Sequence, residues 1–147
     1  MIIRTANISE KRALEELQRR ASLNNAGDRQ ALLDHPDAIS VPIEQLEAGC
    51  VFVAERDGVR VGFAAVVGRS DGGAELDALF VEPTEWRGGI GRALVEHCAD
   101  VARNRGASTL HVIGNPHARG FYLASGFAIT GTTETRFGTG LAMQRTL

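Results

Sequence analysis

The sequence has few cysteines and no long apolar run, and both absences restrict the class of protein. Its two cysteines, Cys50 and Cys98, lie in separate apolar stretches without a C-x-x-C spacing. This pattern supports neither a zinc site nor a redox pair, and we predict two buried thiols. No apolar stretch approaches the about 20 residues that a membrane-spanning helix requires. Arg4 interrupts the N-terminus before any apolar block of the signal-peptide kind, so we expect no membrane segment and a cytoplasmic location.

A surplus of positive charge is also missing. The 16 Lys and Arg residues are balanced by 18 Asp and Glu residues, so the net charge is −2 and no global field attracts nucleic acid or an anionic membrane. No internal repeat, low-complexity tract or linker divides the chain. Its 147 residues, 44% of them apolar and 23% charged, suit one globular unit. We predict a single domain over residues 1–147.

Changes in the period of the apolar residues predict a mixed α/β fold. Strands are predicted at residues 2–6, 50–56, 59–67, 74–81 and 109–113. Two more are predicted, one before and one after residues 137–140. Helices are predicted after the N-cap pair Asn7 and Glu10, from Asp28 to Leu33, and at residues 89–105 and 117–125. The order is an antiparallel meander, a β-α-β unit, and then a helix followed by a hairpin. It favours a three-layer α/β (α+β mixed) domain over a doubly wound sheet.

Glycine is abundant, and three of the 17 glycines fall in the segment from Trp86 to Arg92, where a predicted strand passes into a helix. Successive N–H groups at a helix N-terminus can hold a phosphate or pyrophosphate when no Cβ obstructs it, and Arg87 and Arg92 add charge at the rim. The alternative is a glycine-rich turn that only begins a helix, and the pattern alone does not choose. No Gly-Lys-Ser/Thr follows, and Leu94 takes the last position of G-x-G-x-x-G. A nucleoside-triphosphate loop and a nicotinamide cofactor are therefore not expected.

Three blocks of the sequence resemble the GNAT superfamily of acetyl-CoA dependent N-acetyltransferases. Residues 75–83 (ELDALFVEP) are similar to the family's central strand, and residues 86–91 to its pyrophosphate loop, Gln/Arg-x-x-Gly-x-Gly/Ala. Residues 115–122, with the Gly-Phe pair at 126–127, resemble its late Asn-x-x-Ala-x-x-Phe-Tyr…Gly-Phe motif. Together the blocks cover roughly residues 74–127, and three in this order are far more specific than one. Trp86 departs from the pattern, because the family usually has Gln or Arg there.

The resemblance implies a GNAT-like fold, with a central mixed and mostly antiparallel sheet flanked by helices, and acetyl-CoA as a cosubstrate without a metal. The loop would hold the diphosphate, and main-chain groups of the central strand would pair with the pantetheine arm. The implied cofactor-binding residues are Leu79, Phe80, Val81, Arg87, Gly88, Gly89, Ile90, Gly91, Arg92 and Asn115. For Asn115, a role as a turn or helix cap is an equal alternative.

Transfer to an amine requires a base, because an alkylammonium of pKa near 10.4 leaves under about one part in a thousand reactive at neutral pH. Alternation along strand 74–81 predicts one face that carries Glu75, Asp77, Leu79 and Val81. Burial and a like-charged neighbour would raise a carboxylate's pKa toward that of a useful base. By the resemblance, Glu75 also occupies the position of the catalytic glutamate in part of the family. Asp77 is a second candidate base or binds the substrate ammonium, and a solvated or ion-paired carboxylate is the alternative for both.

The leaving thiolate, whose thiol has a pKa near 8.5, requires an acid. By the resemblance that acid is Tyr122, the only tyrosine in the chain; a half-buried structural aromatic is its alternative. Cys98 lies on the apolar face of a predicted helix, which argues against an acetyl-enzyme and favours direct attack in a ternary complex. His111 and His117 lack a metal-ligand spacing and are predicted to be structural.

The acceptor amine is not specified by the sequence. By the resemblance it would bind between residues 20–48 and the hairpin at residues 134–140, where acidic side chains slightly outnumber basic ones. This favours a cationic amine weakly and leaves both small-molecule and peptide acceptors open; a homodimer would be usual for the family. The alternative function is a non-catalytic CoA- or acyl-CoA-binding sensor or interaction module of the same fold. The presence of Glu75, Asn115 and Tyr122 weighs against that alternative, and Trp86 weighs for it.

Overall fold

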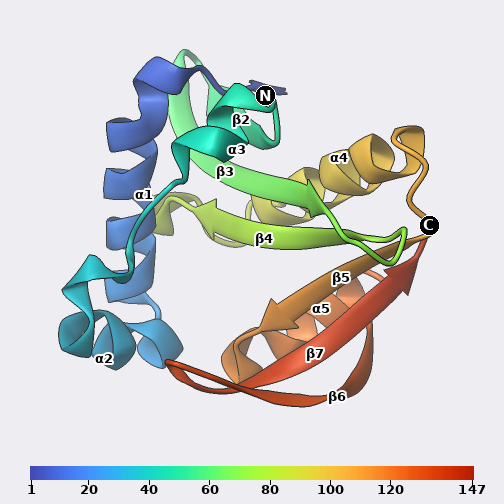
Figure 1. Cartoon of the computed structure of the whole chain (residues 1–147). Coiled ribbons are helices and arrows are strands. Elements are labelled where there is room, and N and C mark those ends of the chain that lie inside the picture. Colours follow the sequence, from blue (N-terminus) through green and yellow to red (C-terminus); the bar gives the residue numbers. More distant parts are fainter.

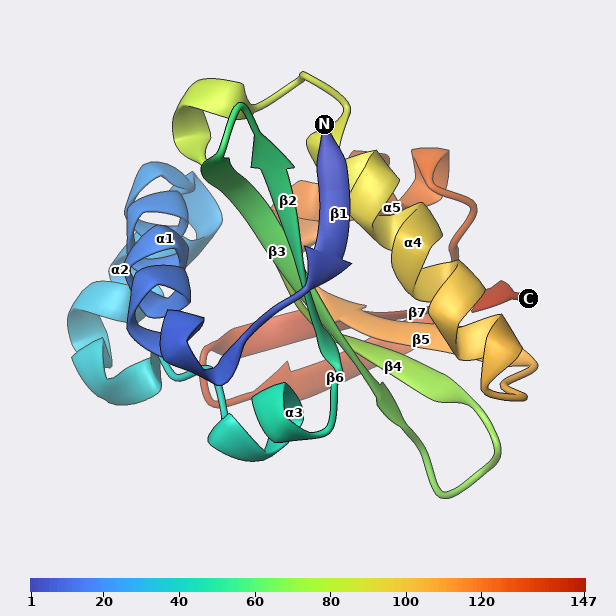
Figure 2. The ribbon, with the colours of Figure 1, turned by 90° about the horizontal axis from the view of Figure 1, so that it is seen from above.

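The computed structural model describes the backbone of residues 1–147 and all side chains except those of residues 26 and 27. Seven strands form one sheet in the order β1-β2-β3-β4-β5-β7-β6, with helices on both faces (Figure 1, Figure 2). The strands are β1 (Ile2–Thr5), β2 (Val51–Arg56), β3 (Val59–Gly68), β4 (Ala74–Val81), β5 (Thr109–Gly114), β6 (Ala128–Thr135) and β7 (Gly138–Thr146). The α-helices are α1 (Lys11–Asn24), α2 (Ala26–Asp34), α3 (Ile43–Glu47), α4 (Ile90–Asn104) and α5 (Arg119–Ala124). Short 3-10 turns are η1 (Ile8–Glu10), η2 (Pro36–Ala38), η3 (Pro83–Glu85) and η4 (Pro116–Ala118).

The three-layer mixed α/β architecture predicted from the sequence is confirmed. Every neighbouring strand pair is antiparallel except β4 and β5, which are parallel and joined through α4. The capping box between Asn7 and Glu10 forms, although it opens the turn η1 rather than α1 directly. The second helix starts at residue 26 instead of being capped by Asp28. No helix in the described part of the chain is long and apolar enough to cross a membrane.

Each face of the sheet has its own apolar core. On one face, Leu94 and Cys98 of α4 pack with buried residues of β3, β4 and β5. On the other face, Leu14 of α1 and Leu46 of α3 pack with Phe63 of β3. The sheet therefore separates an α4–α5 side from an α1–α3 side, and a side chain on β4 must face one or the other.

A β-bulge in β4 decides which side chains face which side. On β3, Ala65 pairs with Ala78 and the next residue, Val66, pairs with Leu76, so Asp77 is an extra residue on β4. A bulge interrupts strict alternation at that point. Leu76 and Leu79 both pack against the α4 core, whereas Ala78 packs against the α1 core.

The prediction that Glu75, Asp77, Leu79 and Val81 share one face is therefore wrong beyond the bulge. Leu79 and Val81 contact the α4 core, like Leu76. Glu75 and Asp77 flank Leu76 and lie on the opposite, α1 side. The two carboxylates stay together, but the strand residues after them are inverted because the bulge adds one residue.

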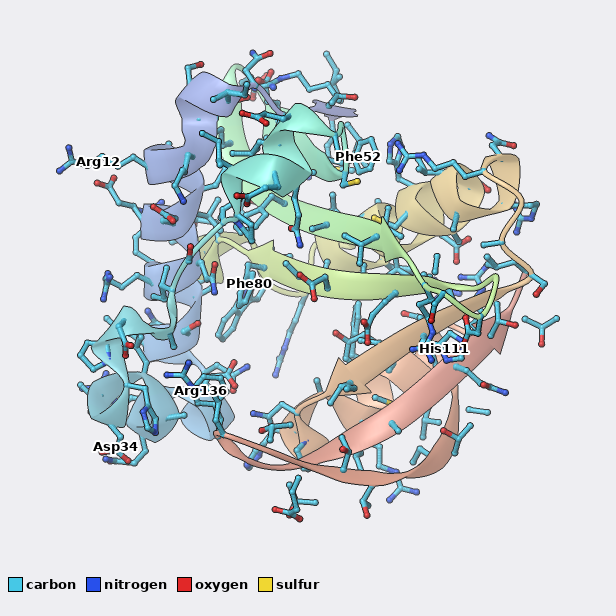
Figure 3. All side chains as sticks on the ribbon, in the orientation of Figure 1. Arg12, Asp34, Phe52, Phe80, His111 and Arg136 are labelled. Atoms are coloured by element: carbon cyan, nitrogen blue, oxygen red, sulfur yellow. The ribbon has the colours of Figure 1, made fainter. Side chains whose placement is uncertain are left out.

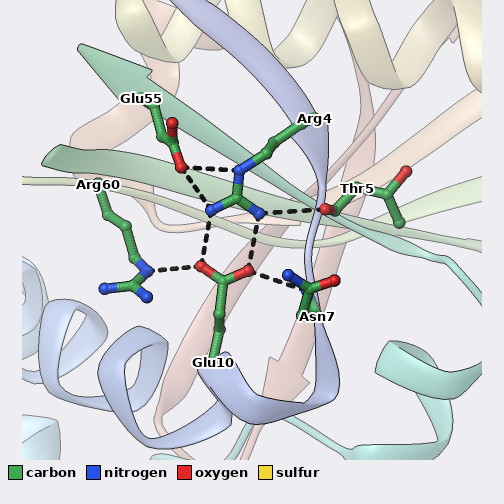
Figure 4. Close-up of polar contacts among 6 residues, drawn as sticks. All are labelled: Arg4, Thr5, Asn7, Glu10, Glu55 and Arg60. Carbon is green, nitrogen blue, oxygen red and sulfur yellow. Dashed lines mark hydrogen bonds and ion pairs between the residues drawn. The ribbon is translucent and has the colours of Figure 1, made fainter. Parts of the chain in front are cut away.

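An ion cluster around Glu10 attaches the start of α1 to the sheet (Figure 4). Glu10, only 3% exposed, accepts hydrogen bonds of 2.7 and 2.8 Å from the Arg4 guanidinium and another from the Arg60 Nε. The Asn7 backbone N–H also donates to it, at 2.9 Å, and Glu55 binds the other edge of Arg4. The hydrogen bonds from Arg4, followed by those from Asn7 and Arg60, lower the pKa of Glu10 from 4.5 to about 2 despite its burial. This cluster fixes β1, β2, β3 and η1 relative to one another.

Candidate active site

The parallel pair β4–β5 separates almost at once, and this opens the sheet. Only two pairs of residues are in register, Ala74 with Leu110 and Glu75 with His111. Beyond them the strands diverge, with His111 at the junction and Phe80 farther along β4 (Figure 3). The backbone edge of β4 that faces β5 is left without a strand partner over residues 76–81, so a ligand with amide groups can hydrogen-bond to it.

A cavity of about 650 Å³ occupies this opening. That volume is typical of small-molecule and cofactor sites. It is lined by residues 76–81 of β4, the end of β5, parts of the loop before α4, the first turn of α4, the region of α5, and Ala21, Asn25 and Asp28 on the α1–α2 side. The cavity therefore connects a helix N-terminus on the α4 side with the α1 side of the sheet.

The loop before α4 has the conformation of an anion-binding turn. Arg87 and Gly89 adopt left-handed backbone angles, with φ of 69° and 83°, and α4 begins directly after Gly89. A left-handed conformation costs a non-glycine residue about 1–2 kcal/mol, and such strain is concentrated at functional sites. The first amides of α4 have no preceding helical carbonyl to bind, so they are free to meet the diphosphate of a ligand.

Not all of the predicted loop donors are available. The Gly88 N–H donates to the carbonyl of Glu85 at 3.2 Å, and Gly88 is not among the residues that line the cavity. The η3 turn uses this amide to fold the loop back. The other predicted loop residues do line the cavity, namely Arg87, Gly89, Ile90, Gly91 and Arg92.

Trp86, where the resemblance expects Gln or Arg, lies partly exposed at the cavity wall. Its side chain is 43% exposed and lines the cavity. The indole Nε1–H donates to the carbonyl of Val81 at 2.9 Å. Trp86 therefore joins the loop to the end of β4, a connection that the Gln or Arg expected from the resemblance would make with different geometry.

Tyr122 on α5 presents a protonated hydroxyl to the cavity. The side chain is 8% exposed, lines the cavity and packs edge-on against Phe121 and Phe127. Burial, and then the charge of Asp28, raise the pKa of Tyr122 to about 12. Tyr122 forms no hydrogen bond with another described residue. Because every buried side-chain oxygen or nitrogen among the described residues has a partner, the Tyr122 hydroxyl is not buried and is open to a ligand in the cavity.

Glycine at position 114 makes room for this tyrosine. A Cβ on Gly114 would lie 2.5 Å from Cε of Met143 and 3.0 Å from the Tyr122 ring. The 2.5 Å contact is closer than real Cβ atoms come, so a larger residue would displace the flexible end of Met143 and crowd the Tyr122 ring. The end of β5 thereby sets the position of the hydroxyl.

Asn115 acts as a cap and also makes a long-range contact. Its Oδ1 accepts a hydrogen bond of 2.9 Å from the His117 backbone N–H, which confirms the capping role. Its Nδ2 donates to Oδ1 of Asp28 on α2 at 2.7 Å. The sequence contained no signal for this pair, because the partners are 87 positions apart and only the general acidity of residues 20–48 pointed toward Asp28.

The two candidate carboxylates occupy different positions relative to the cavity. Asp77 lines it and accepts a hydrogen bond of 2.8 Å from Nε2 of Gln45 on α3. Glu75 is half-buried outside the lining, with Arg69 at 4.0 Å. It lies across from His111, on the same face of the sheet, where β4 and β5 still pair. Sequence reasoning treated His111 as structural and did not bring it beside Glu75.

The cysteines behave differently from each other. Cys98 is 0% exposed, and burial raises the pKa of its thiol to about 12, so the prediction of an unreactive core thiol is confirmed. Cys50 is only partly buried, with an Arg105 nitrogen 3.8 Å from its sulfur, so the prediction of a second buried thiol is wrong. Among the described side chains, no group of three or more His, Cys, Asp or Glu could hold a metal ion.

A sheet opened at one parallel pair, with a glycine loop at the following helix, is the arrangement expected of a GNAT protein. Residues 12–127 match the family model described as the acetyltransferase (GNAT) family. This match covers well over half of the chain. The protein therefore belongs to the GNAT family of acetyltransferases.

Individual relatives agree with this assignment. The peptidyl-lysine N-acetyltransferase YjaB of Escherichia coli (strain K12) is 38% identical over 84 residues, which are 57% of this chain and 52% of that protein. The chain spans about half the length of the curated relatives it matches. The fold is similar to that of PaiA N-acetyltransferase from Thermoplasma acidophilum in complex with coenzyme A, with a TM-score of 0.79 at 17% identity over 99% of this chain and 98% of that chain. For the ribosomal-protein-alanine N-acetyltransferase from Brucella melitensis the TM-score is 0.75 at 25% identity, over 100% of both chains.

Proposed function

We propose that the protein transfers the acetyl group of acetyl-CoA to a primary amine by direct attack in a ternary complex. One observation carries the proposal: a single cavity joins a glycine turn at a helix N-terminus, the open hydroxyl of Tyr122 and the carboxylate of Asp77. These are the three groups that cosubstrate binding, thiol release and amine binding require. We propose that residues 1–147 form one domain, since all seven strands belong to one sheet.

The cavity suits acetyl-CoA in both shape and chemistry. The turn at residues 87–91 offers amides, helix polarity and the charges of Arg87 and Arg92 to the diphosphate. The edge of β4 over Leu79 to Val81 has no strand partner, and apart from the Val81 carbonyl, which accepts from Trp86, it offers main-chain groups to the pantetheine amides and an N–H to the thioester oxygen. The diphosphate would lie at the start of α4 and the thioester deeper in the opening, near the bulge and Tyr122.

Glu75 and Asp77 divide the work on the acceptor. Asp77, at the cavity wall, binds the ammonium, while Glu75 takes its proton through an intervening water, because it does not itself reach the lining. The amine nitrogen then attacks the thioester carbonyl carbon. The C–N bond forms, the C–S bond breaks, and its electron pair leaves on sulfur.

Tyr122 gives the proton that converts the departing thiolate into CoA thiol, and the tyrosinate regains a proton from the nitrogen of the new amide. Its pKa of about 12 is well above the 8.5 of a thiol in water. Burial also raises the pKa of a thiol, as it does for Cys98 in the apolar core on the same face of the sheet. A CoA thiol that is partly removed from water would therefore be closer in pKa to Tyr122 than a thiol in water.

A covalent acetyl-enzyme is not needed, and neither cysteine thiol is placed to serve as its nucleophile. Cys98 is sealed in the core and protonated, and Cys50 is not among the lining residues. Direct attack requires donor and acceptor to be bound together. A cavity that opens to both faces of the sheet supports this order.

The acceptor is a small-molecule or peptide amine in this proposal, and neither nucleic acid nor membrane takes part. The name of the YjaB relatives specifies peptidyl-lysine, so a lysine side chain is the first acceptor to test. Asp77 and Asp28 both line the cavity, and their negative charge suits a cationic amine.

The experiment uses Trp86, the only tryptophan in the chain, which lines the cavity. Titration with CoA and acetyl-CoA should change its fluorescence with saturation, and acetyl-CoA should release free thiol when a lysine peptide, a peptide with a free N-terminus, or a polyamine is added. No fluorescence change and no calorimetric heat with either ligand would refute the proposal. Saturable binding without thiol release with any of these amines would favour the CoA-sensing alternative.

A further inference from the structure

Asp28 is the point where the N-terminal helices meet the late motif of the chain. It lies in the first turn of α2 and lines the cavity, and its Oδ1 accepts the 2.7 Å hydrogen bond from Asn115. Helix α2 contacts η4, which follows Asn115. One carboxylate thus connects the acceptor side of the molecule to the segment that leads into Tyr122.

The hydrogen bonds of Asn115 leave one orientation for its amide. Oδ1 accepts from the His117 N–H at 2.9 Å, and Nδ2 donates to Asp28. Flipping the amide would set NH₂ against an N–H and oxygen against a carboxylate, so both contacts would become repulsive. Removing Asp28 would leave the amide held at one end only.

Asp28 also acts electrostatically on the acid. After burial, the charge of Asp28 is the second cause that raises the pKa of Tyr122, because a nearby negative charge disfavours a tyrosinate. The other charged groups that line the cavity are Asp77 on β4, Arg92 on α4, and Glu85 and Arg87 in the segment before α4. Arg145 on β7 reaches the Ser125 carbonyl, and its guanidinium is paired with Glu96.

We propose that Asp28 is a positioning residue for acetyl transfer: through Asn115 it attaches α2 to the donor half of the site and sets a negative charge beside the hydroxyl that protonates the thiolate. The inference rests on the proposed function. Its two contributions are separable by chemistry. An asparagine at position 28 keeps an acceptor oxygen for Asn115 but removes the charge, whereas an alanine removes both.

The test compares Asp28→Ala and Asp28→Asn with Asp34→Ala, a control on the same helix. Asp34 is exposed and accepts a hydrogen bond from Gln30, one turn earlier, and it is not among the residues that line the cavity, so its variant should keep wild-type kinetics. Asp28→Ala should raise the KM for acetyl-CoA about tenfold and lower kcat. Asp28→Asn should keep KM within twofold and lower kcat several-fold, and Asp28→Glu should recover part of the alanine defect.

A double variant shows whether Asp28 acts through Asn115. If it does, Asp28→Ala combined with Asn115→Ala should have the same KM as the single Asn115→Ala variant. Additive effects of the two substitutions on KM would overturn the inference. It would also be overturned if Asp28→Ala kept the wild-type KM and kcat and changed only the melting temperature. If Asp28→Ala fails to fold, Asp28→Asn with unchanged kcat and KM overturns it equally.

Failure of the proposed function gives a different result. Wild-type protein would then release no thiol, yet CoA affinity can still be measured by Trp86 fluorescence. Weaker CoA binding in Asp28→Ala than in Asp34→Ala would retain the connection to Asn115 without catalysis. Equal affinities would refute the connection as well.

Discussion

The two halves of the cavity that we propose for the donor and for the acceptor use different chemical groups. The donor half consists of the unpaired edge of β4, the turn at residues 87–91 and α5, all within one stretch of chain, and it offers mainly backbone groups. The acceptor half depends on side chains that meet across long sequence separations, such as Asp28 with Asn115 and Asp77 with Gln45. Backbone geometry is specified locally by glycines and helix ends, whereas side-chain pairs exist only after folding.

The tip of the β6–β7 hairpin, on the acceptor side, is likewise held by contacts between side chains that are far apart in the sequence. Arg136 lies over the ring of Phe137, 4.8 Å from its centroid, and 3.8 Å from Asp37 in η2. His35 packs edge-on against the same ring, with 5.5 Å between centroids. Figure 3 shows Arg136 at this tip beside the N-terminal helices. The acceptor side is thus closed by exposed side-chain contacts, each worth little in stability and readily changed between relatives.

The largest effect is expected in the donor half, from Tyr122→Phe. This variant keeps the packing against Phe121 and Phe127 and removes the hydroxyl. Loss of a general acid should lower kcat about 100-fold or more, while CoA affinity, followed by Trp86 fluorescence, should stay within twofold. An undiminished kcat in a variant with normal CoA binding would eliminate Tyr122 as the acid.

The second prediction separates the two carboxylates on the acceptor side. Glu75→Gln should lower kcat about 100-fold and leave the KM for the amine nearly unchanged, because Glu75 moves a proton without holding the acceptor. Asp77→Asn should chiefly raise the KM for the amine, about tenfold, the equivalent of one weakened charged hydrogen bond. Steady-state kinetics with a lysine peptide measures both quantities. The opposite pattern would exchange the two roles.

The third prediction concerns the ion cluster that holds α1, and with it the acceptor half, on the sheet. Glu10→Gln should lower the free energy of unfolding by about 2 kcal/mol, because it weakens buried hydrogen bonds to two guanidinium groups. Glu16→Gln, on α1 directly after η1, is the control, since Glu16 and Arg12 form an exposed pair at 3.6 Å. The control should change stability by less than about 0.5 kcal/mol. Urea unfolding compares the two, and equal stabilities would mean that the cluster contributes nothing.

The same cluster gives a signed pH dependence. Because the pKa of Glu10 falls from 4.5 to about 2 on folding, the unfolded chain binds more protons between these values. The stabilisation is complete above about pH 4.5 and is lost as the pH falls toward 2. Wild-type protein should therefore lose more stability than Glu10→Gln over this range. Parallel curves for the two proteins would contradict the assigned pKa.

The smallest effect is expected from a matched pair of glycine substitutions at the two ends of α4. Gly89 and Gly106 both have left-handed φ, 83° and 90°, and a Cβ on either would meet no atom within 4 Å. Alanine at either position should cost about 1 kcal/mol of stability. Only Gly89→Ala should also weaken CoA binding, by up to about tenfold. Equal CoA affinity in both variants would show that the turn does not bind the diphosphate.

Prediction from sequence worked where a pattern is short and local. The glycine turn and the capping pair Asn7–Glu10 were found because each depends on a few neighbouring residues. The failures have a common cause. The bulge at Asp77, the donation of the Gly88 amide to Glu85 and the partial exposure of Cys50 all depend on how one segment packs against another, and no local pattern encodes that packing.

The amino-acid order by itself determined the family, the sequence of the strands and of the helices other than α3, and the segment of chain that we propose as the donor half. Those features follow from local periodicity and from glycines whose conformations need no distant partner. Only the tertiary structure decided which face each β4 side chain takes, that Asp77 and not Glu75 borders the cavity, and that Asp28 reaches Asn115. The physical reason is that side-chain contacts between segments far apart in the chain form only when the sheet brings those segments together.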